Sequence, residues 1–145
     1  MISGLTLNAH NLVALYVAAL QALAHGTRHI VDSMNARGYK IDTIFLTGGM
    51  AKNELFVQIT ADVTRCRVVL AKQSEAVLLG SAILAAVASK QYVDLYAAMK
   101  AMNRVGAVFE ATKDASVTSF HDTKHKIFHL QYQHQLELRK LEGLL

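Results

Sequence analysis

Two adjacent glycines, Gly48 and Gly49, follow a short apolar run and are well suited to hold a ligand against the main chain. Glycine has no side chain to keep a flat ring or a phosphate away, and it adopts φ and ψ angles that other residues avoid. Asn53 lies where a helix N-cap would stand, so its amide can accept from free backbone N–H groups or meet a ligand. This pattern suits a nucleotide-binding turn, but a paired glycine at such a place is also common without a ligand. The alternative is a simple tight turn between a strand and a helix.

The residues around this turn predict a strand–helix–strand unit. Residues 43–47 are β-branched and apolar, as in a buried parallel strand. An amphipathic helix follows the turn and ends near Arg65, and residues 67–70 form a second strand. A crossover of this kind is right-handed, and ligands bind beyond the carboxyl ends of its strands. Gly48 and Gly49 lie at such an end.

Further helices are predicted on both sides of this unit. Apolar residues at helical spacing predict one long helix over 8–35, which can kink at Gly26 and has Gly38 as its C′ residue. Ser74 is the expected N-cap of a helix over 76–89, with Glu75 as an acid in its first turn. The small residues of that helix allow close packing against another helix or a ligand. A shorter helix is predicted over 94–103.

The C-terminal part is predicted to be irregular over 104–119, apart from a short strand at Val108 and Phe109. A last helix is expected over 122–141. Its apolar seam is expected to pack while its other faces are solvated. The residues of that seam are Ile127, Leu130, His134, Leu138 and Leu141.

The composition predicts one globular domain. Of the 145 residues, 52% are hydrophobic and 18% charged, and the absence of proline favours long helices. The net charge of +4 is scattered, with no basic stripe between aromatic residues, so nucleic acid is not an expected partner. The uncharged run at 76–89 is shorter than the roughly 20 residues that cross a bilayer, and residues 1–11 do not resemble a secretory signal. No membrane association is predicted.

Cys66 is the one cysteine of the chain, which excludes an internal disulfide and a cysteine-based zinc site. A reducing, cytoplasmic setting is therefore expected. No histidine lies near Cys66 in sequence, so we predict a packing residue and no catalytic nucleophile.

Three histidines recur every four residues in the last helix: His121, His125 and His129. A metal site of this kind usually recruits a carboxylate at a matching position, whereas this face has Asp122 and Lys124 beside it. We therefore predict a row of surface histidines and no metal. Three other histidines are expected on helix surfaces or in packing contacts, namely His10, His25 and His29.

The order of motifs over residues 43–85 resembles a known family. A strand leads into Gly-Gly-Met-Ala-Lys-Asn, the next helix ends in Ala61-Asp62, and a second strand precedes a Glu-x-x-x-x-Gly-x-Ala helix that starts at Glu75. This order and spacing resemble the C-terminal half of FGGY-family carbohydrate kinases, most closely the ribulose or ribitol kinase group. The resemblance covers most of the chain and identifies residues 1–145 as the nucleotide-side lobe.

This resemblance implies an α/β fold, an actin-like, hexokinase-like (ribonuclease H-like) lobe that is helix-rich with a short parallel sheet. Two lobes flank a cleft in this family, and ATP, with Mg²⁺, lies mainly against the C-terminal one. The implied contacts with the nucleotide are Gly48, Gly49 and Met50 beside the adenosine and α-phosphate, and Asn53 on the adenine side. Glu54 and Met50 depart from the family, where proline and a small residue or leucine are usual.

No aspartate of this chain has glycine two residues later, so the Asp-x-Gly phosphate turn of such kinases is missing. Phosphoryl transfer needs several groups to converge on the γ-phosphate. We therefore expect an ATP-binding lobe without catalytic residues, inactive without an N-terminal lobe that also holds the sugar. The expected acceptor is a pentulose such as D-ribulose, or a related polyol. The chain would then be a truncated protein, a shortened gene product or one piece of a larger kinase.

An alternative from another class is a non-catalytic interaction module. Loss of a lobe would expose apolar surface on the first helix and around residues 76–88, and such patches favour association with a partner or a second copy of the chain. A homodimer is the form that self-association would take.

Overall fold

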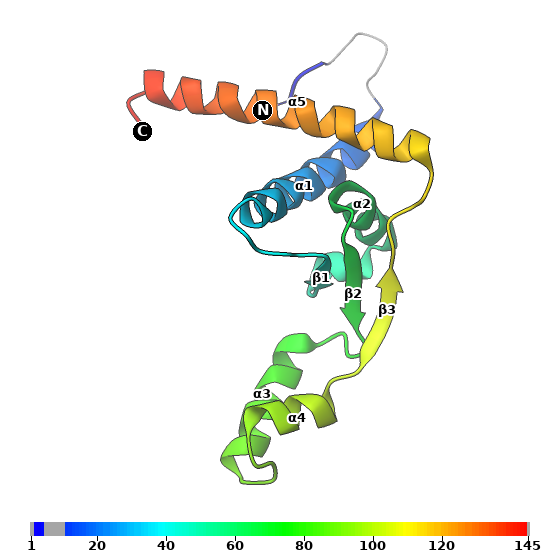
Figure 1. Cartoon of the computed structure of the whole chain (residues 1–145), viewed down its shortest axis with the longest axis vertical. Helices are drawn as coiled ribbons and strands as arrows, with labels where there is room; N and C mark the ends of the chain where they lie inside the picture. The colour runs from blue at the N-terminus through cyan, green and yellow to red at the C-terminus, as the bar shows by residue number, and fades with distance from the viewer. Residues whose placement is uncertain (1, 5–10, 145) are drawn as a thin grey trace.

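The computed structural model describes residues 2–4 and 11–144. The predicted start of the first helix at Asn8, and His10, lie outside this range. Figure 1 shows the arrangement of the elements. In chain order they are α1 (Leu12–Asn35), β1 (Thr43–Leu46), the 3₁₀ helix η1 (Gly49–Lys52), α2 (Glu54–Thr64), β2 (Arg67–Ala71), α3 (Ala76–Ala88), α4 (Leu95–Met102), β3 (Val105–Phe109) and α5 (Ala115–Leu141).

The sheet has the order β1-β2-β3. β1 and β2 are parallel, with Thr43 opposite Arg67, which confirms the predicted strand–helix–strand unit. The prediction of a parallel sheet is wrong for β3, which pairs antiparallel with β2. The reason is the path of the chain, since α3 and α4 pack on each other and return to the edge where β2 ended. The result is a helix-rich α/β fold with a small mixed sheet.

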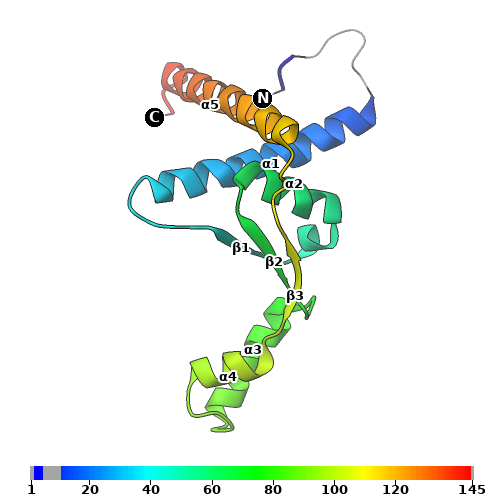
Figure 2. The same cartoon turned by 45° about the vertical axis from the view of Figure 1, so that its right-hand side comes forward.

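The core is built around α2, which packs on α1 and on the sheet. Toward α1, Phe56 and Val63 belong to one buried cluster with Leu20. Toward the sheet, Val57 and Val68 are fully buried. Burying one such side chain stabilises a fold by about 1.5–3 kcal/mol. Figure 2 shows α1 and α2 stacked over the sheet, and α3 and α4 extending from its far end.

Several helix ends agree with the sequence pattern and one does not. Asn53 caps α2, as predicted. The helix predicted over 94–103 is α4, and Asp94 is its N-cap. α1 ends at Asn35, as predicted, and its C-cap is Ala36. Gly38 is therefore not the C′ residue, although it does adopt a positive φ of 96°. The predicted cap at Ser74 is wrong, because Glu75 is the N-cap of α3 and no side chain caps that helix.

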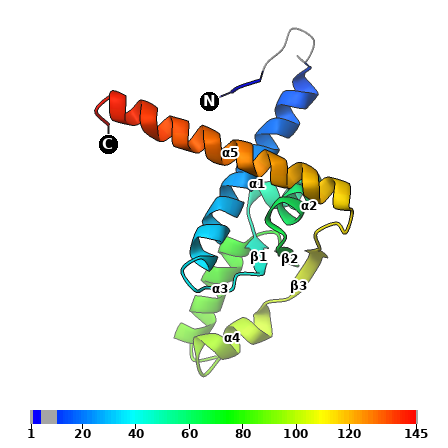
Figure 3. The same cartoon turned by 45° about the horizontal axis from the view of Figure 1, so that its top comes forward.

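α5 differs most from the prediction. It starts at Ala115 because the Asp114 carboxylate accepts from the Ser116 N–H at 2.8 Å, and a five-residue strand, β3, precedes it. The predicted packing seam is wrong. Leu130 and Leu141 are 71% and 86% exposed, and the buried residues of α5 are His121 and His125. Figure 3 shows the cause, since α5 crosses α1 with its N-terminal half and its other half extends beyond the body.

Apolar side chains are exposed on two helices. Leu12 and Ile30 of α1 are 82% and 60% exposed, and Val77 and Leu78 of α3 are 83% and 67% exposed. These are the two regions where the sequence predicts uncovered apolar surface. Within residues 2–4 and 11–144, no helix combines the length and apolar character that crossing a bilayer requires.

The sheet gives a prediction for Gly106. A Cβ on this residue would lie 2.9 Å from the carbonyl carbon and oxygen of Ala71, so Gly106→Ala should lower the free energy of unfolding by about 1–3 kcal/mol. The matched control is Gly80→Ala in α3, where no atom lies within 4 Å of the new Cβ. It should raise the free energy by roughly 0.5–1 kcal/mol through helix propensity. Urea titration of both variants checks this, and equal effects would contradict the packing around Gly106.

Candidate functional site

A pocket of about 120 Å³ lies at the carboxyl ends of β1 and β2. Both strands end there because they are parallel and neighbouring, and ligands of open α/β sheets bind at this edge. The residues that line it are Leu46, Thr47, Gly48, Ala51, Lys52, Leu70, Ala71, Lys72, Gln73, Ser74 and Ala76.

Gly48 gives the pocket a stretch of bare main chain. Its φ of 86° and ψ of −166° belong to a region of backbone conformation that only glycine adopts readily. No atom lies within 4 Å of the position that its Cβ would occupy, so a ligand can approach the peptide there. Gly49 begins η1, and the Ala51 N–H donates to the Gly48 carbonyl at 3.1 Å to close this turn.

Met50 and Asn53 lie beside the pocket and do not line it. The Asn53 side chain holds the turn against α1, because its Nδ2 donates to the Tyr16 hydroxyl at 2.7 Å. Its Oδ1 accepts from the Phe56 N–H at 3.2 Å and so caps α2. Of the four predicted ligand residues, Gly48 lines the pocket, whereas Gly49, Met50 and Asn53 do not.

Four polar residues that line the pocket were not predicted from the sequence to be ligand residues. Lys52 ends η1, and Lys72, Gln73 and Ser74 follow β2. Lys72, Gln73 and Ser74 could have been predicted, because neighbouring parallel strands end at the same edge of a sheet. Lys52 Nζ lies 3.8 Å from the carboxylate of Glu75, with both side chains exposed. Two ammonium groups, an amide and a hydroxyl are donors that suit an anion. The lining contains no carboxylate and no imidazole.

Residues 1–89 match the family model described as the FGGY family of carbohydrate kinases, C-terminal domain. The chain belongs to the FGGY family. It is 41% identical over 145 residues to the FGGY carbohydrate kinase domain-containing protein of Xenopus laevis, covering 99% of this chain and 26% of that protein. Its counterpart in Homo sapiens is 42% identical over 140 residues, which are 94% of this chain and 25% of the human protein. The ribulokinase of Halalkalibacterium halodurans is 37% identical over 100 residues, which are 68% of this chain and 18% of the ribulokinase.

Solved structures of sugar kinases share this fold. The xylulose kinase from Rhodospirillum rubrum superposes with a TM-score of 0.75 at 24% identity, over 94% of this chain and 27% of that one. The glycerol kinase of Plasmodium falciparum, determined with ADP, has a TM-score of 0.68 at 27% identity, over 94% and 26%. The chain therefore has the actin-like, hexokinase-like fold of the FGGY family, and it spans about a quarter of the length of these relatives.

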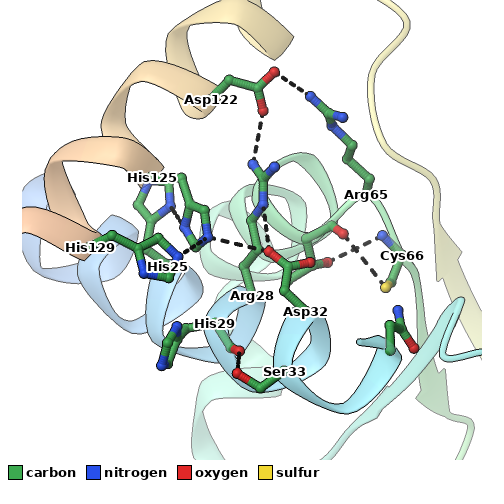
Figure 4. Close-up of polar contacts among 12 residues, drawn as sticks. His25, Arg28, His29, Asp32, Ser33, Arg65, Cys66, Asp122, His125 and His129 are labelled. Atoms are coloured by element: carbon green, nitrogen blue, oxygen red, sulfur yellow. Dashed lines mark hydrogen bonds and ion pairs between the residues drawn. The ribbon is translucent and has the colours of Figure 1, made fainter. Parts of the chain in front are cut away.

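The histidines of this FGGY chain are not where the sequence predicts them. His121 and His125 are 5% and 7% exposed, so the predicted surface row is wrong. They are buried because the N-terminal half of α5 lies on α1, where His125 meets His25 (Figure 4). His25 is 4% exposed, which confirms its packing role. Among the residues that the structure describes, no three potential ligands from His, Cys, Asp and Glu are arranged to hold a metal ion.

Cys66 is a packing residue, as predicted. It is 3% exposed just before β2, and its Sγ lies 3.6 Å from the Thr64 carbonyl oxygen. Burial raises the pKa of the Cys66 thiol, which keeps it protonated and unreactive at neutral pH.

The contacts of Asn53 predict a mainly structural effect of its replacement. Asn53→Ala removes the cap of α2 and the bond to Tyr16, so the free energy of unfolding should fall by about 1 kcal/mol. Asn53→Ser keeps a capping oxygen and should recover most of that loss. Urea unfolding of both variants measures the difference. An unchanged midpoint for Asn53→Ala would show that the cap does not stabilise this turn.

Proposed function

We propose that this chain forms the ATP-binding side of an ATP-dependent carbohydrate kinase. The observation that carries the proposal is the pocket where β1 and β2 end, with the bare main chain of Gly48 on its wall. Lys52 and Lys72 place positive charge beside that main chain, as a nucleotide phosphate chain requires. Membership of the FGGY family and the relative determined with ADP support the same assignment.

In this proposal the chain binds and orients ATP and leaves the chemistry to other groups. The main chain at Gly48 and Gly49 accommodates the nucleotide, while Met50 and Asn53 bound the adenine side. The lining contains no carboxylate, whereas Mg²⁺ usually takes one or two carboxylates in addition to phosphate oxygens. This pocket therefore does not fit Mg²⁺ by itself. A base that takes the proton of the sugar hydroxyl must also come from outside this chain.

The acceptor that we propose is a pentulose such as D-ribulose, or a related polyol. Support comes from ribulokinases among the relatives, one of them 37% identical over 100 residues. The sugar would be held chiefly by a second lobe, across the cleft from Gly48. A cytoplasmic location belongs to the same proposal, because Cys66 is a free thiol.

The exposed apolar faces of α1 and α3 would be covered by other parts of such a kinase. A second copy of the chain is the other candidate for these faces. Size-exclusion chromatography with light scattering distinguishes the two, since a monomer made more stable by ATP supports the kinase lobe and a dimer insensitive to nucleotide does not.

The proposal is tested by calorimetric titration of the chain with ATP and with ADP. Ala51→Leu fills the pocket and should weaken ATP binding at least tenfold, whereas Ala101→Leu, on the exposed surface of α4, should not change it. The chain joined to an N-terminal FGGY lobe should phosphorylate D-ribulose, and the chain alone should not. ATP binding that ignores Ala51→Leu, or sugar turnover by the isolated chain, would overturn the proposal.

A further inference from the structure

Three buried histidines form the contact between α1 and the N-terminal half of α5. His25 Nδ1 of α1 lies 3.3 Å from His125 Nδ1 of α5, and the two rings are stacked with centroids 5.4 Å apart. The ring of His121 lies 5.9 Å from that of His25. His121 and His125 are the buried residues of α5. We call His25, His121 and His125 the histidine joint.

The apolar core does not hold α5 in place. Its two clusters of buried residues come from α1, α2 and β2, with partly buried side chains of β1, β2 and β3 beside them. α5 is attached instead through the histidine joint, through the rings of Phe128 and Tyr132, which lie against His25 and His29 of α1, and through Asp122. This carboxylate accepts from Arg28 Nη1 of α1 at 3.0 Å and from Arg65, which follows α2. The docking of α5 therefore depends on polar and titratable groups together with these two aromatic rings.

We propose that the histidine joint is a pH-sensitive device: α5 stays docked on α1 while the three imidazoles are neutral and leaves α1 when they take up protons. α1, α2 and the sheet stay folded during this change, because their apolar core does not include α5. The proposal rests on the fold alone and is independent of the proposed kinase function.

Each hydrogen bond within the joint requires at least one neutral ring. A bond between His25 Nδ1 and His125 Nδ1 needs one N–H donor and one bare nitrogen acceptor. His125 Nε2 also lies 3.0 Å from His129 Nε2, so His125 can donate through one nitrogen and accept through the other. Protonation makes both nitrogens of a ring donors. A fully protonated joint would place N–H against N–H at these contacts.

Some charged groups around the joint favour protonation of its imidazoles, and others oppose it. Carboxylates favour protonation, since Asp32 Oδ2 of α1 lies 3.3 Å from His125 Nε2, and Asp62 of α2 and Asp122 of α5 act on His121. Positive groups oppose it. Arg28 of α1 acts on all three rings and Lys124 of α5 on His25, while the imidazoles also repel one another once charged.

Burial and the positive groups lower the pKa of the three imidazoles by more than the carboxylates raise it. Burial, followed by the neighbouring His125, lowers the pKa of His25 from 6.5 to about 4, and burial also lowers the pKa of His121 and of His125. The neutral rings are thus preferred when α5 is docked. Docking is at full strength above pH 6.5 and weakens as the pH falls from 6.5 toward 4. At pH 5 the change in His25 alone weakens docking about 30-fold.

Hydrogen–deuterium exchange of the full chain tests the joint. Rates at pH 7.5 and pH 5.0, corrected for the pH dependence of intrinsic exchange, are compared between peptides from the docked part of α5, residues 115–128, and from Glu54–Thr64. A helix without packing is marginal in water, so α5 should lose protection at least tenfold at pH 5.0 while α2 keeps its own. Unchanged protection of α5, or loss of protection in α2 at the same pH, would overturn the proposal.

Matched variants separate the joint from a general effect of acid. His25→Asn keeps an amide near the position of Nδ1 but does not titrate, so α5 should stay protected at pH 5.0. His121→Asn serves the same purpose if the first variant does not fold. His134→Asn is the control, because His134 is exposed on the same helix, and α5 should still be released. Release of α5 from folded His25→Asn and His121→Asn chains to the wild-type extent would overturn the proposal.

Discussion

The burial of α2 between α1 and the sheet is the interaction on which the rest of this structure depends. One face of α2 presents Phe56 and Val63 to α1, and another presents Val57 and Ala61 to the sheet. Within the described residues, α2 has seven buried residues, more than any other helix. Because α2 connects β1 to β2 from one side, the two strands run parallel and end at the same edge. The pocket at Gly48 is a direct consequence of that packing.

The unit from β1 to β2 could be predicted from the sequence because its signals are local. The apolar run before Gly48, the cap at Asn53 and the apolar spacing of α2 lie within one short stretch of chain, and the structure agrees with each of them. The pocket could be predicted only in part. Gly48 lines it as expected, whereas Lys72 and Ser74 follow a different strand and become visible only once the two strands are placed side by side.

The C-terminal part could not be predicted as well, because an apolar stripe shows which face of a helix could pack and not what covers it. Leu130 and Leu141 form such a stripe on α5, but the helix meets α1 near its other end, through His121 and His125. The direction of β3 depends on how α3 and α4 return the chain, which no short motif encodes. The start of α5 did have a local signal in Asp114, a good N-cap residue.

Gly48 and the residues after β2 together account for how this FGGY chain could hold ATP, so the most direct measurement is the site of nucleotide contact. Amide chemical shifts of the ¹⁵N-labelled chain during titration with ATP report it residue by residue. The account predicts that shifts concentrate in residues 46–48, 51–52 and 70–76 and are small in α4. Shifts centred elsewhere, or none at millimolar ATP, would contradict it.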